Sequence, residues 1–87
     1  MNESDSKISD AITVDAKGLK CPMPVIRLQQ QVRKSQSGDR IVIECTDPGA
    51  EKDIQSWAKV NKHSVEECET TDFGLRITLR VVGRNGL

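Results

Sequence analysis

The order of hydrophobic patterns along the chain is the feature that most restricts the fold. Two segments repeat apolar residues at helical spacing, residues 25–32 and 50–58, and short stretches of β-branched residues lie before, between and after them. This order of strand, helix, strand, helix, strand and strand predicts an α/β fold of the α+β two-layer sandwich type. Two helices then cover one face of a four-stranded mixed sheet, and 87 residues suffice for only one such unit.

Turn residues mark the ends of the expected elements. Pro22 and Pro24 are compatible with a first helical turn, so the first helix is expected to start beside Cys21 and to stop at Gly38. Asp47 is expected to cap the second helix, which fades near residue 61. Strands are expected at residues 12–15, 41–46, 65–70 and 75–81.

The two ends of the chain differ from this pattern. Residues 1–10 are polar and predict a disordered leader, residues 11–83 a single domain, and residues 84–87 a free tail. No apolar run approaches the length of a membrane span or the core of a signal peptide. We therefore expect a cytoplasmic protein without a membrane partner.

The balance of charges and the spacing of the cysteines exclude several classes. Thirteen Lys and Arg residues balance 13 Asp and Glu residues, so the uniformly basic field that favours non-specific nucleic-acid binding is absent. Cys21, Cys45 and Cys68 show no Cys-x-x-Cys spacing, and the single His63 has no cysteine partner at zinc-finger distance. We expect neither a disulfide scaffold nor a metal or other cofactor.

Cys21 stands where a glycine-containing loop meets the first helix, in the segment Gly18-Leu19-Lys20-Cys21-Pro22-Met23-Pro24. The positive end of a helix stabilises a thiolate, so we expect the pKa of Cys21 to be lowered, with Lys20 adding to the effect. A purely structural helix would carry Ser, Asp or Asn at this cap. The pattern favours an exposed, ionised sulfur that could carry a persulfide over a buried structural thiol.

The remaining thiols and the imidazole are interpreted as structural. Cys45 lies in an apolar strand and is expected to be buried. Strand parity places Cys68 on the same face as Glu66, exposed and without a group that would activate it. His63 follows the second helix, where a surface hydrogen bond is the commoner role.

The segment Leu19-Lys20-Cys21-Pro22-Met23-Pro24, with Asp15 and Gly18 before it and Asp47-Pro48 and Asp53 after it, resembles the TusA/SirA family of sulfur carriers over residues 14–82. The resemblance implies a two-layer sandwich that carries a persulfide on Cys21. It names Gly18, Pro22 and Pro24 as the scaffold of the site, and Asp47, Pro48 and Asp53 as supporting positions.

The resemblance also implies partners. Family members act as co-substrates more than as free-standing enzymes. They accept sulfane sulfur from a cysteine desulfurase or a rhodanese-type donor and pass it to a DsrE-like protein, toward tRNA 2-thiolation, molybdenum cofactor synthesis or sulfur oxidation. Met23 occupies a position that is acidic in some tRNA-thiolation members, and this argues against assigning the chain to that branch.

Two alternatives belong to other functional classes. A similar fold occurs in the C-terminal domain of a translation initiation factor, which suggests a regulatory or nucleic-acid-binding module by fold analogy alone. With no Tyr and a single Phe, the chain offers no evident platform for stacking bases. The other alternative is a thiol redox or selenium-handling protein in which Cys45 or Cys68 resolves an oxidised Cys21.

Overall fold

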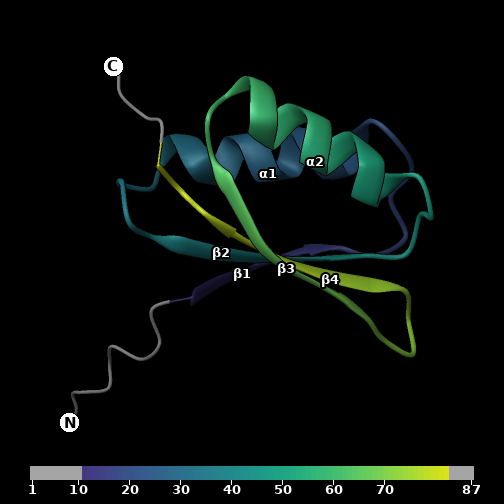
Figure 1. The fold of residues 1–87 in the computed structure, drawn as a ribbon. Helices are drawn as coiled ribbons and strands as arrows, with labels where there is room; N and C mark the ends of the chain where they lie inside the picture. The colour runs from purple at the N-terminus through teal and green to yellow at the C-terminus, as the bar shows by residue number, and fades with distance from the viewer. Residues whose placement is uncertain (1–10, 83–87) are drawn as a thin grey trace, which may run out of the picture.

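The computed structural model describes residues 11–82 and shows one sheet covered on one face by two helices (Figure 1). The expected leader 1–10 and tail 84–87, with residue 83 of the expected domain, lie outside the described residues. The elements, in chain order, are β1 (Ala11–Ala16), α1 (Met23–Arg33), β2 (Arg40–Cys45), α2 (Ala50–Val60), β3 (Ser64–Thr70) and β4 (Leu75–Arg80).

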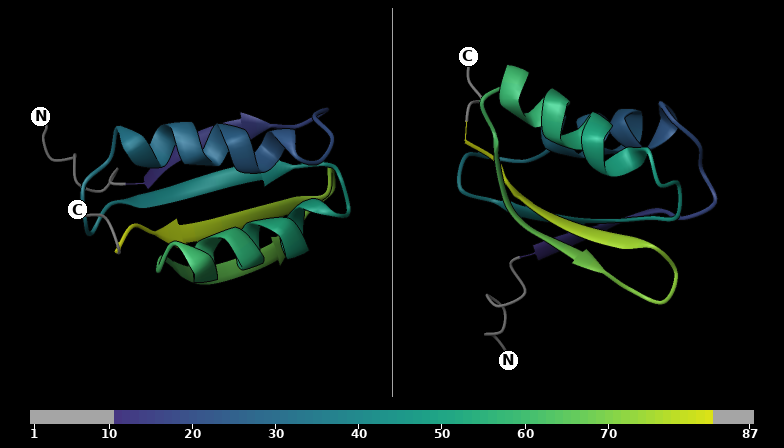
Figure 2. Two further views of the ribbon diagram at one scale, coloured as in Figure 1. Left: turned by 90° about the horizontal axis from the view of Figure 1, so that it is seen from above. Right: turned by 45° about the vertical axis from the view of Figure 1, so that its right-hand side comes forward.

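The sheet is mixed, with the strand order β1-β2-β4-β3. β1 and β2 are parallel and are joined through α1, whereas β4 runs antiparallel to both β2 and β3. Figure 2 shows that α1 lies over the β1–β2 half of the sheet and α2 over the β3–β4 half, and that both helices begin at the same end of the molecule. The predicted fold class is confirmed.

The core lies between the sheet and the helices and is aliphatic. It forms because alternate strand residues and every third or fourth helix residue are apolar, so each element has one face to bury. Each fully buried aliphatic side chain contributes about 1.5–3 kcal/mol. The buried set comprises Ala16, Leu28, Val32, Ile41, Ile43, Cys45, Ala50, Ile54, Ala58, Ile77, Leu79 and Val81.

The first helix ends earlier than expected, at Arg33 instead of Gly38. Here the amides of Lys34 and Ser35 donate to the carbonyls three residues before them, so the last turn tightens, and the Ser35 hydroxyl donates to the Gln31 carbonyl at 2.8 Å. Gly38 instead adopts a positive φ of 96° in the following turn, and its N–H donates to the Val81 carbonyl at 2.7 Å.

The parity expected for the third strand is also wrong. Val65 pairs with Leu79 and Glu67 pairs with Thr78, so three residues of β3 oppose two of β4, and the next pair is Cys68 with Ile77. Such a β-bulge reverses the alternation of faces along the strand. Cys68 therefore lies on the helix-covered face with Ile77, whereas Glu66 lies on the opposite face.

The sheet face away from the helices carries charged side chains in alternating sign. Glu44 contacts Lys17 at 3.0 Å and Arg76 at 3.2 Å. On the same face, Glu66 contacts Arg40 at 3.0 Å and Arg80 at 2.6 Å. These pairs keep the open face of the sheet polar, which explains the low apolar fraction of the chain.

Within residues 11–82, neither helix is long and apolar enough to cross a membrane. The same residues contain no cluster of three or more His, Cys, Asp or Glu side chains arranged to hold a metal ion.

Candidate functional site

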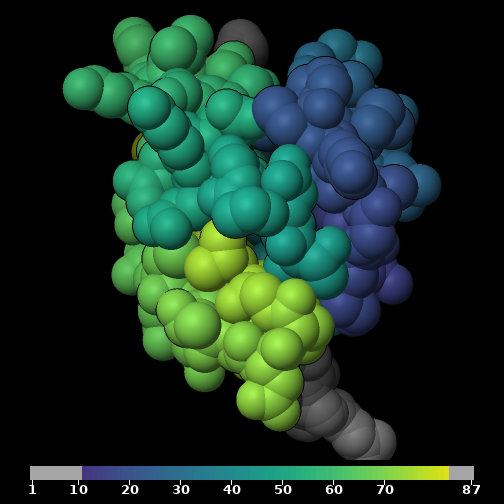
Figure 3. Space-filling model, turned by 90° about the vertical axis from the view of Figure 1, so that its right-hand side faces the viewer, coloured from purple at the N-terminus to yellow at the C-terminus, as the bar shows by residue number. Residues whose placement is uncertain are grey.

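Cys21 lies in the loop between β1 and α1, at the end of the molecule where both parallel strands finish. The loop from β2 to α2 approaches Cys21, because two parallel strands have their carboxyl ends at the same end of the sheet. Figure 3 views this end and shows the β1–α1 segment, the start of α2 and the turn after β3 meeting on one surface. The side chain of Cys21 is exposed, as expected.

Two hydrogen bonds tie the loops together. The Cys21 N–H donates to Asp47 Oδ2 at 2.9 Å, and the Gly18 N–H donates to Thr46 Oγ1 at 2.9 Å. Gly18 has φ +84°, a conformation that other residues adopt only with strain. The β2–α2 loop therefore fixes the backbone on both sides of the turn that presents Cys21.

Asp47 does not cap α2, contrary to the sequence-based expectation. Residue Gly49 occupies the N-cap position, and no side chain bonds to the first-turn amides there. One carboxylate oxygen of Asp47 accepts the Cys21 N–H and the other accepts the Gly49 N–H at 3.4 Å. Asp47 thus fixes the loop that carries Cys21 and does not cap the start of α2.

The sulfur of Cys21 has a carboxylate as its hydrogen-bond partner. Its thiol donates to Oδ2 of Asp53, which projects from the first turn of α2. The two residues are 32 positions apart in the chain, so only the packing of α2 beside α1 brings them together. Gly18, Asp47 and Asp53, all singled out from the sequence, therefore surround Cys21 in space.

The expected lowering of the Cys21 pKa is wrong, and the structure shows why. The thiol's hydrogen bond to Asp53 raises the pKa most, followed by partial desolvation and by the negative charges of Asp53 and Asp47. These four effects all act in the same direction. At neutral pH the resting sulfur is consequently a thiol.

The helix end cannot offset these effects, because its amides are already occupied or missing. Pro22 and Pro24 have no N–H, the Met23 N–H donates to the Lys20 carbonyl at 2.8 Å, and the Val25 N–H donates to the Pro22 carbonyl at 3.1 Å. A thiolate at Cys21 would therefore find no free first-turn donor. The prolines that mark the motif remove the anion-stabilising groups that a helix start normally offers.

The other expected site residues have different roles. Pro24 is fully buried and belongs to the core, whereas Pro22 is exposed at the N-cap of α1. Lys20 is exposed, and Pro48 lies at the start of the outer face of α2. Thr46 was missed from the sequence, although a hydroxyl directly before Asp47-Pro48-Gly49 was the available signal.

Comparisons with known proteins agree on one family. Residues 12–81 match the family described as "Sulfurtransferase TusA". YrkI of Bacillus subtilis strain 168, named as a candidate sulfur carrier protein, is 39% identical over 61 residues, which cover 70% of this chain and 79% of that protein. This chain belongs to the TusA family. The family predicted from the cysteine motif is therefore confirmed.

Other TusA relatives are longer. YrkF of the same strain, also named as a candidate sulfur carrier, is 35% identical over 85% of this chain, and a candidate sulfur carrier of Aquifex aeolicus strain VF5 is 40% identical over 69%. The matched segment spans only 40% and 30% of those two proteins. A crystal structure of a SirA-like protein from Desulfitobacterium hafniense superposes with a TM-score of 0.70 at 26% identity, covering 84% of this chain and 99% of that one.

The two other thiols of this TusA-family chain have environments that differ from that of Cys21. Cys45 is fully buried, as expected, and burial raises its pKa to about 11. Cys68 is exposed, and partial burial and its hydrogen bond to Glu51 raise its pKa. β4 lies between the strands of Cys45 and Cys68, so their Cα atoms are roughly 10 Å apart, beyond the reach of a disulfide without backbone movement.

His63 has a structural environment. Its Nδ1 accepts the Val82 N–H at 3.2 Å, and its ring lies 5.3 Å from the ring of Trp57. The imidazole thereby ties the end of the sheet to α2, at the opposite end of that helix from Asp53.

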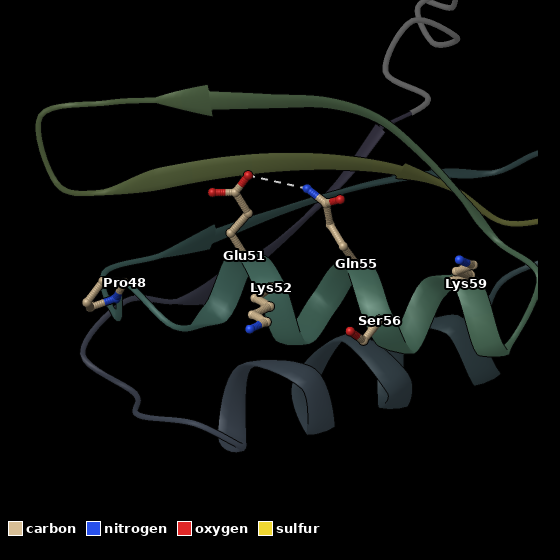
Figure 4. A pocket seen from close by; sticks show the side chains of 6 residues that line it. All are labelled: Pro48, Glu51, Lys52, Gln55, Ser56 and Lys59. Atoms are coloured by element: carbon tan, nitrogen blue, oxygen red, sulfur yellow. Dashed lines mark hydrogen bonds between the residues drawn. The ribbon is translucent and has the colours of Figure 1, made fainter.

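A shallow groove of about 470 Å³ runs along the outer face of α2 (Figure 4). Glu51 and Gln55 border it on the side of the β3–β4 pair and are hydrogen bonded to each other at 3.3 Å, while Lys52 and Ser56 lie on the side of α1. These flexible polar side chains form a solvated helix face. The sulfur of Cys21 does not line this groove.

Proposed function

We propose that this protein carries sulfane sulfur as a persulfide on Cys21, and that Asp53 accepts the proton of that thiol during loading and returns one during delivery. The observation that supports the proposal most directly is the exposed Cys21 thiol donating its hydrogen bond to the Asp53 carboxylate. Membership of the TusA family adds support, since its matched relatives are named for sulfur transport. A carboxylate beside a thiol is a suitable general base.

Loading is a nucleophilic displacement at sulfur. As the Cys21 sulfur attacks the terminal sulfur of a donor persulfide, Asp53 accepts the thiol proton. A new S–S bond forms on Cys21 and the donor's own S–S bond breaks, so the donor leaves as a thiolate that takes up the proton. The sulfane sulfur is transferred from the donor to Cys21 without net oxidation or reduction.

Delivery reverses these roles. An acceptor thiolate attacks the outer sulfur, the S–S bond on Cys21 breaks, and the Cys21 sulfur leaves with the electron pair. It takes up, through Asp53, the proton that the acceptor thiol released on ionising, and the resting thiol returns. The negative charges of Asp47 and Asp53 oppose an anion on the Cys21 sulfur, so return of a proton as the S–S bond breaks assists its departure.

The exposure of the sulfur suits exchange between proteins. Donor and acceptor must each bring a sulfur within bonding distance of Cys21, and a buried thiol would prevent this. We propose a cysteine desulfurase or a rhodanese-type protein as donor and a DsrE-like protein as acceptor, in the cytoplasm. The relay would serve tRNA 2-thiolation, molybdenum cofactor synthesis or sulfur oxidation.

Mass spectrometry after incubation with a cysteine desulfurase and cysteine tests the proposal. One additional sulfur atom is expected on the peptide that contains Cys21. The Cys68→Ser variant is the matched control, because it removes the other exposed thiol and should load normally. Undiminished loading of the Cys21→Ser variant would refute the assignment.

The role of Asp53 needs a separate measurement. Asp53→Asn keeps the size of the side chain but removes both the base and the main cause of the raised Cys21 pKa, so we expect the loading rate and its pH dependence to change. Asp39→Asn, a similar change in the turn before β2, should leave both unchanged. An identical pH profile for wild type and Asp53→Asn would show that Asp53 does not accept the proton.

A further inference from the structure

The free edge of β1 and the adjacent face of α1 border a groove of about 190 Å³ that the chemistry of Cys21 leaves unused. It is lined by Thr13 and Val14 of β1 and by Arg27, Gln30, Gln31 and Lys34 of α1. We propose that this groove binds an acidic, extended segment of a partner protein as an added strand on β1. The segment lies between strand and helix, with its carboxylates against Arg27 and Lys34.

The backbone of β1 supports strand addition. β1 is an outer strand of the sheet, and its sole strand partner among the described residues is β2. In a parallel pair, alternate residues direct their N–H and C=O groups away from the partner. Extended peptides bind to such unpaired edges through main-chain hydrogen bonds.

The charges beside the groove favour an acidic segment. Residues 16–38 contain five Lys and Arg residues and no Asp or Glu, in a chain that has 13 of each sign. Within residues 11–82, neither Arg27 nor Lys34 forms a salt bridge, although Arg27 lies near enough to Asp15 of β1 to help lower the pKa of that carboxyl, whereas Lys17 is paired with Glu44. Two cations beside an open strand edge would pair with the side chains of an acidic strand.

The position of the groove connects it with Cys21. α1 begins two residues after Cys21, and β1 ends five residues before it, so the loop with the thiol closes one end of the groove. A segment seated on β1 would bring the rest of its protein to the exposed sulfur. That this protein is a sulfur donor or acceptor rests on the proposed function, but binding of the segment does not require the thiol.

Fluorescence anisotropy with a labelled eight-residue peptide of alternating Glu and Thr tests the groove. We expect this peptide to bind at least tenfold more tightly than the same peptide with Lys in place of Glu. Methylation of alternate backbone nitrogens on the peptide should weaken binding by a similar factor, because it removes the main-chain donors of the added strand. Equal binding of the methylated peptide would overturn strand addition.

Charge variants locate the binding surface. Arg27→Glu combined with Lys34→Glu should weaken binding about tenfold, since both favourable contacts become repulsive. Lys59→Glu combined with Lys62→Glu makes the same change of charge near the end of α2 and should alter binding less than twofold. The milder Arg27→Gln, Lys34→Gln pair, checked by circular dichroism, separates lost binding from lost folding. Equal effects of the two Glu pairs would refute the assigned surface.

Two further measurements separate the competing explanations. An eight-nucleotide oligouridine that binds as tightly as the acidic peptide, with the same response to the variants, would show that the surface recognises charge alone and would overturn the proposal. The Cys21→Ser protein should bind the peptide as wild type does while losing persulfide loading. Peptide binding without loading in the wild-type protein would refute only the proposed function, and loading without peptide binding would refute only the groove.

Discussion

Replacing Gly74 by Ala should destabilise the fold, because the turn between β3 and β4 presses against the end of β2. A Cβ atom on Gly74 would lie 2.4 Å from the Cys45 carbonyl oxygen and 3.0 Å from Cα of Thr46. Both are backbone atoms, so no side-chain rotation relieves the overlap. Gly74 also has φ +147°, a conformation that residues with a side chain rarely adopt.

The expected loss is large for a domain of this size. Backbone strain at such a φ costs about 1–3 kcal/mol, and forcing extra volume into a packed contact costs about 1–3 kcal/mol more. The free energy of unfolding for the 72 residues described is on the order of 4–11 kcal/mol. Gly74→Ala should therefore lower it by about 2–6 kcal/mol, which is about half of the total.

Gly38→Ala provides the matched control. Gly38 also has a positive φ, +96°, but a Cβ there would meet no atom within 4 Å. Its replacement should cost only the backbone term, about 1–2 kcal/mol. Urea unfolding followed by circular dichroism measures both variants. If they lose the same stability within about 0.5 kcal/mol, the close approach of Gly74 to β2 is not what destabilises the Gly74→Ala variant.

The displaced backbone leads directly to the site, so the same variant has a second readout. Thr46 and Asp47 follow Cys45 and bond the amides of Gly18 and Cys21. Pushing this segment outward should loosen the loop that presents the thiol. We expect the rate of persulfide loading in folded Gly74→Ala protein to differ from that of Gly38→Ala.

Three further predictions concern titratable groups. Asp53→Asn should lower the pKa of Cys21, because it removes the strongest cause of the raised value. Iodoacetamide should therefore alkylate Cys21 faster at pH 8 in the variant. An unchanged rate would contradict the contact between Cys21 and Asp53. Burial raises the pKa of Cys45 to about 11 from the usual 9.0, so the stability that the buried thiol adds should be present below pH 9 and be lost as the pH rises through 11. Cys45→Ala should flatten this alkaline decline in the free energy of unfolding. An equally steep decline in the variant would exclude Cys45 as its source. Lys17 and Arg76 lower the pKa of Glu44 below its usual 4.5, so its stabilising effect should be present above pH 4.5 and be lost as the pH falls. In urea unfolding, the stability of Glu44→Gln should decline less steeply with acid than that of the wild type. Parallel curves would argue against these ion pairs.

The local pattern of the chain was sufficient for the elements and the fold class. Alternation in β4 and helical spacing in α2 are properties of neighbouring residues, and they predicted which side chains enter the core. The position of Cys21 beside two prolines likewise predicted a helix start and an exposed sulfur. These inferences succeeded because periodicity and turn chemistry act over a few residues.

The state of the thiol was decided by contacts that local sequence does not reveal. The helix start suggested an ionised sulfur, yet the packing of α2 brings Asp53 to it and Asp47 close by, and both oppose ionisation. The bulge in β3 likewise reversed the face of Cys68, because register depends on the partner strand. Local sequence thus determined where the sulfur lies in the fold. Long-range packing determined whether that sulfur keeps its proton, because electrostatic effects depend on distance in space.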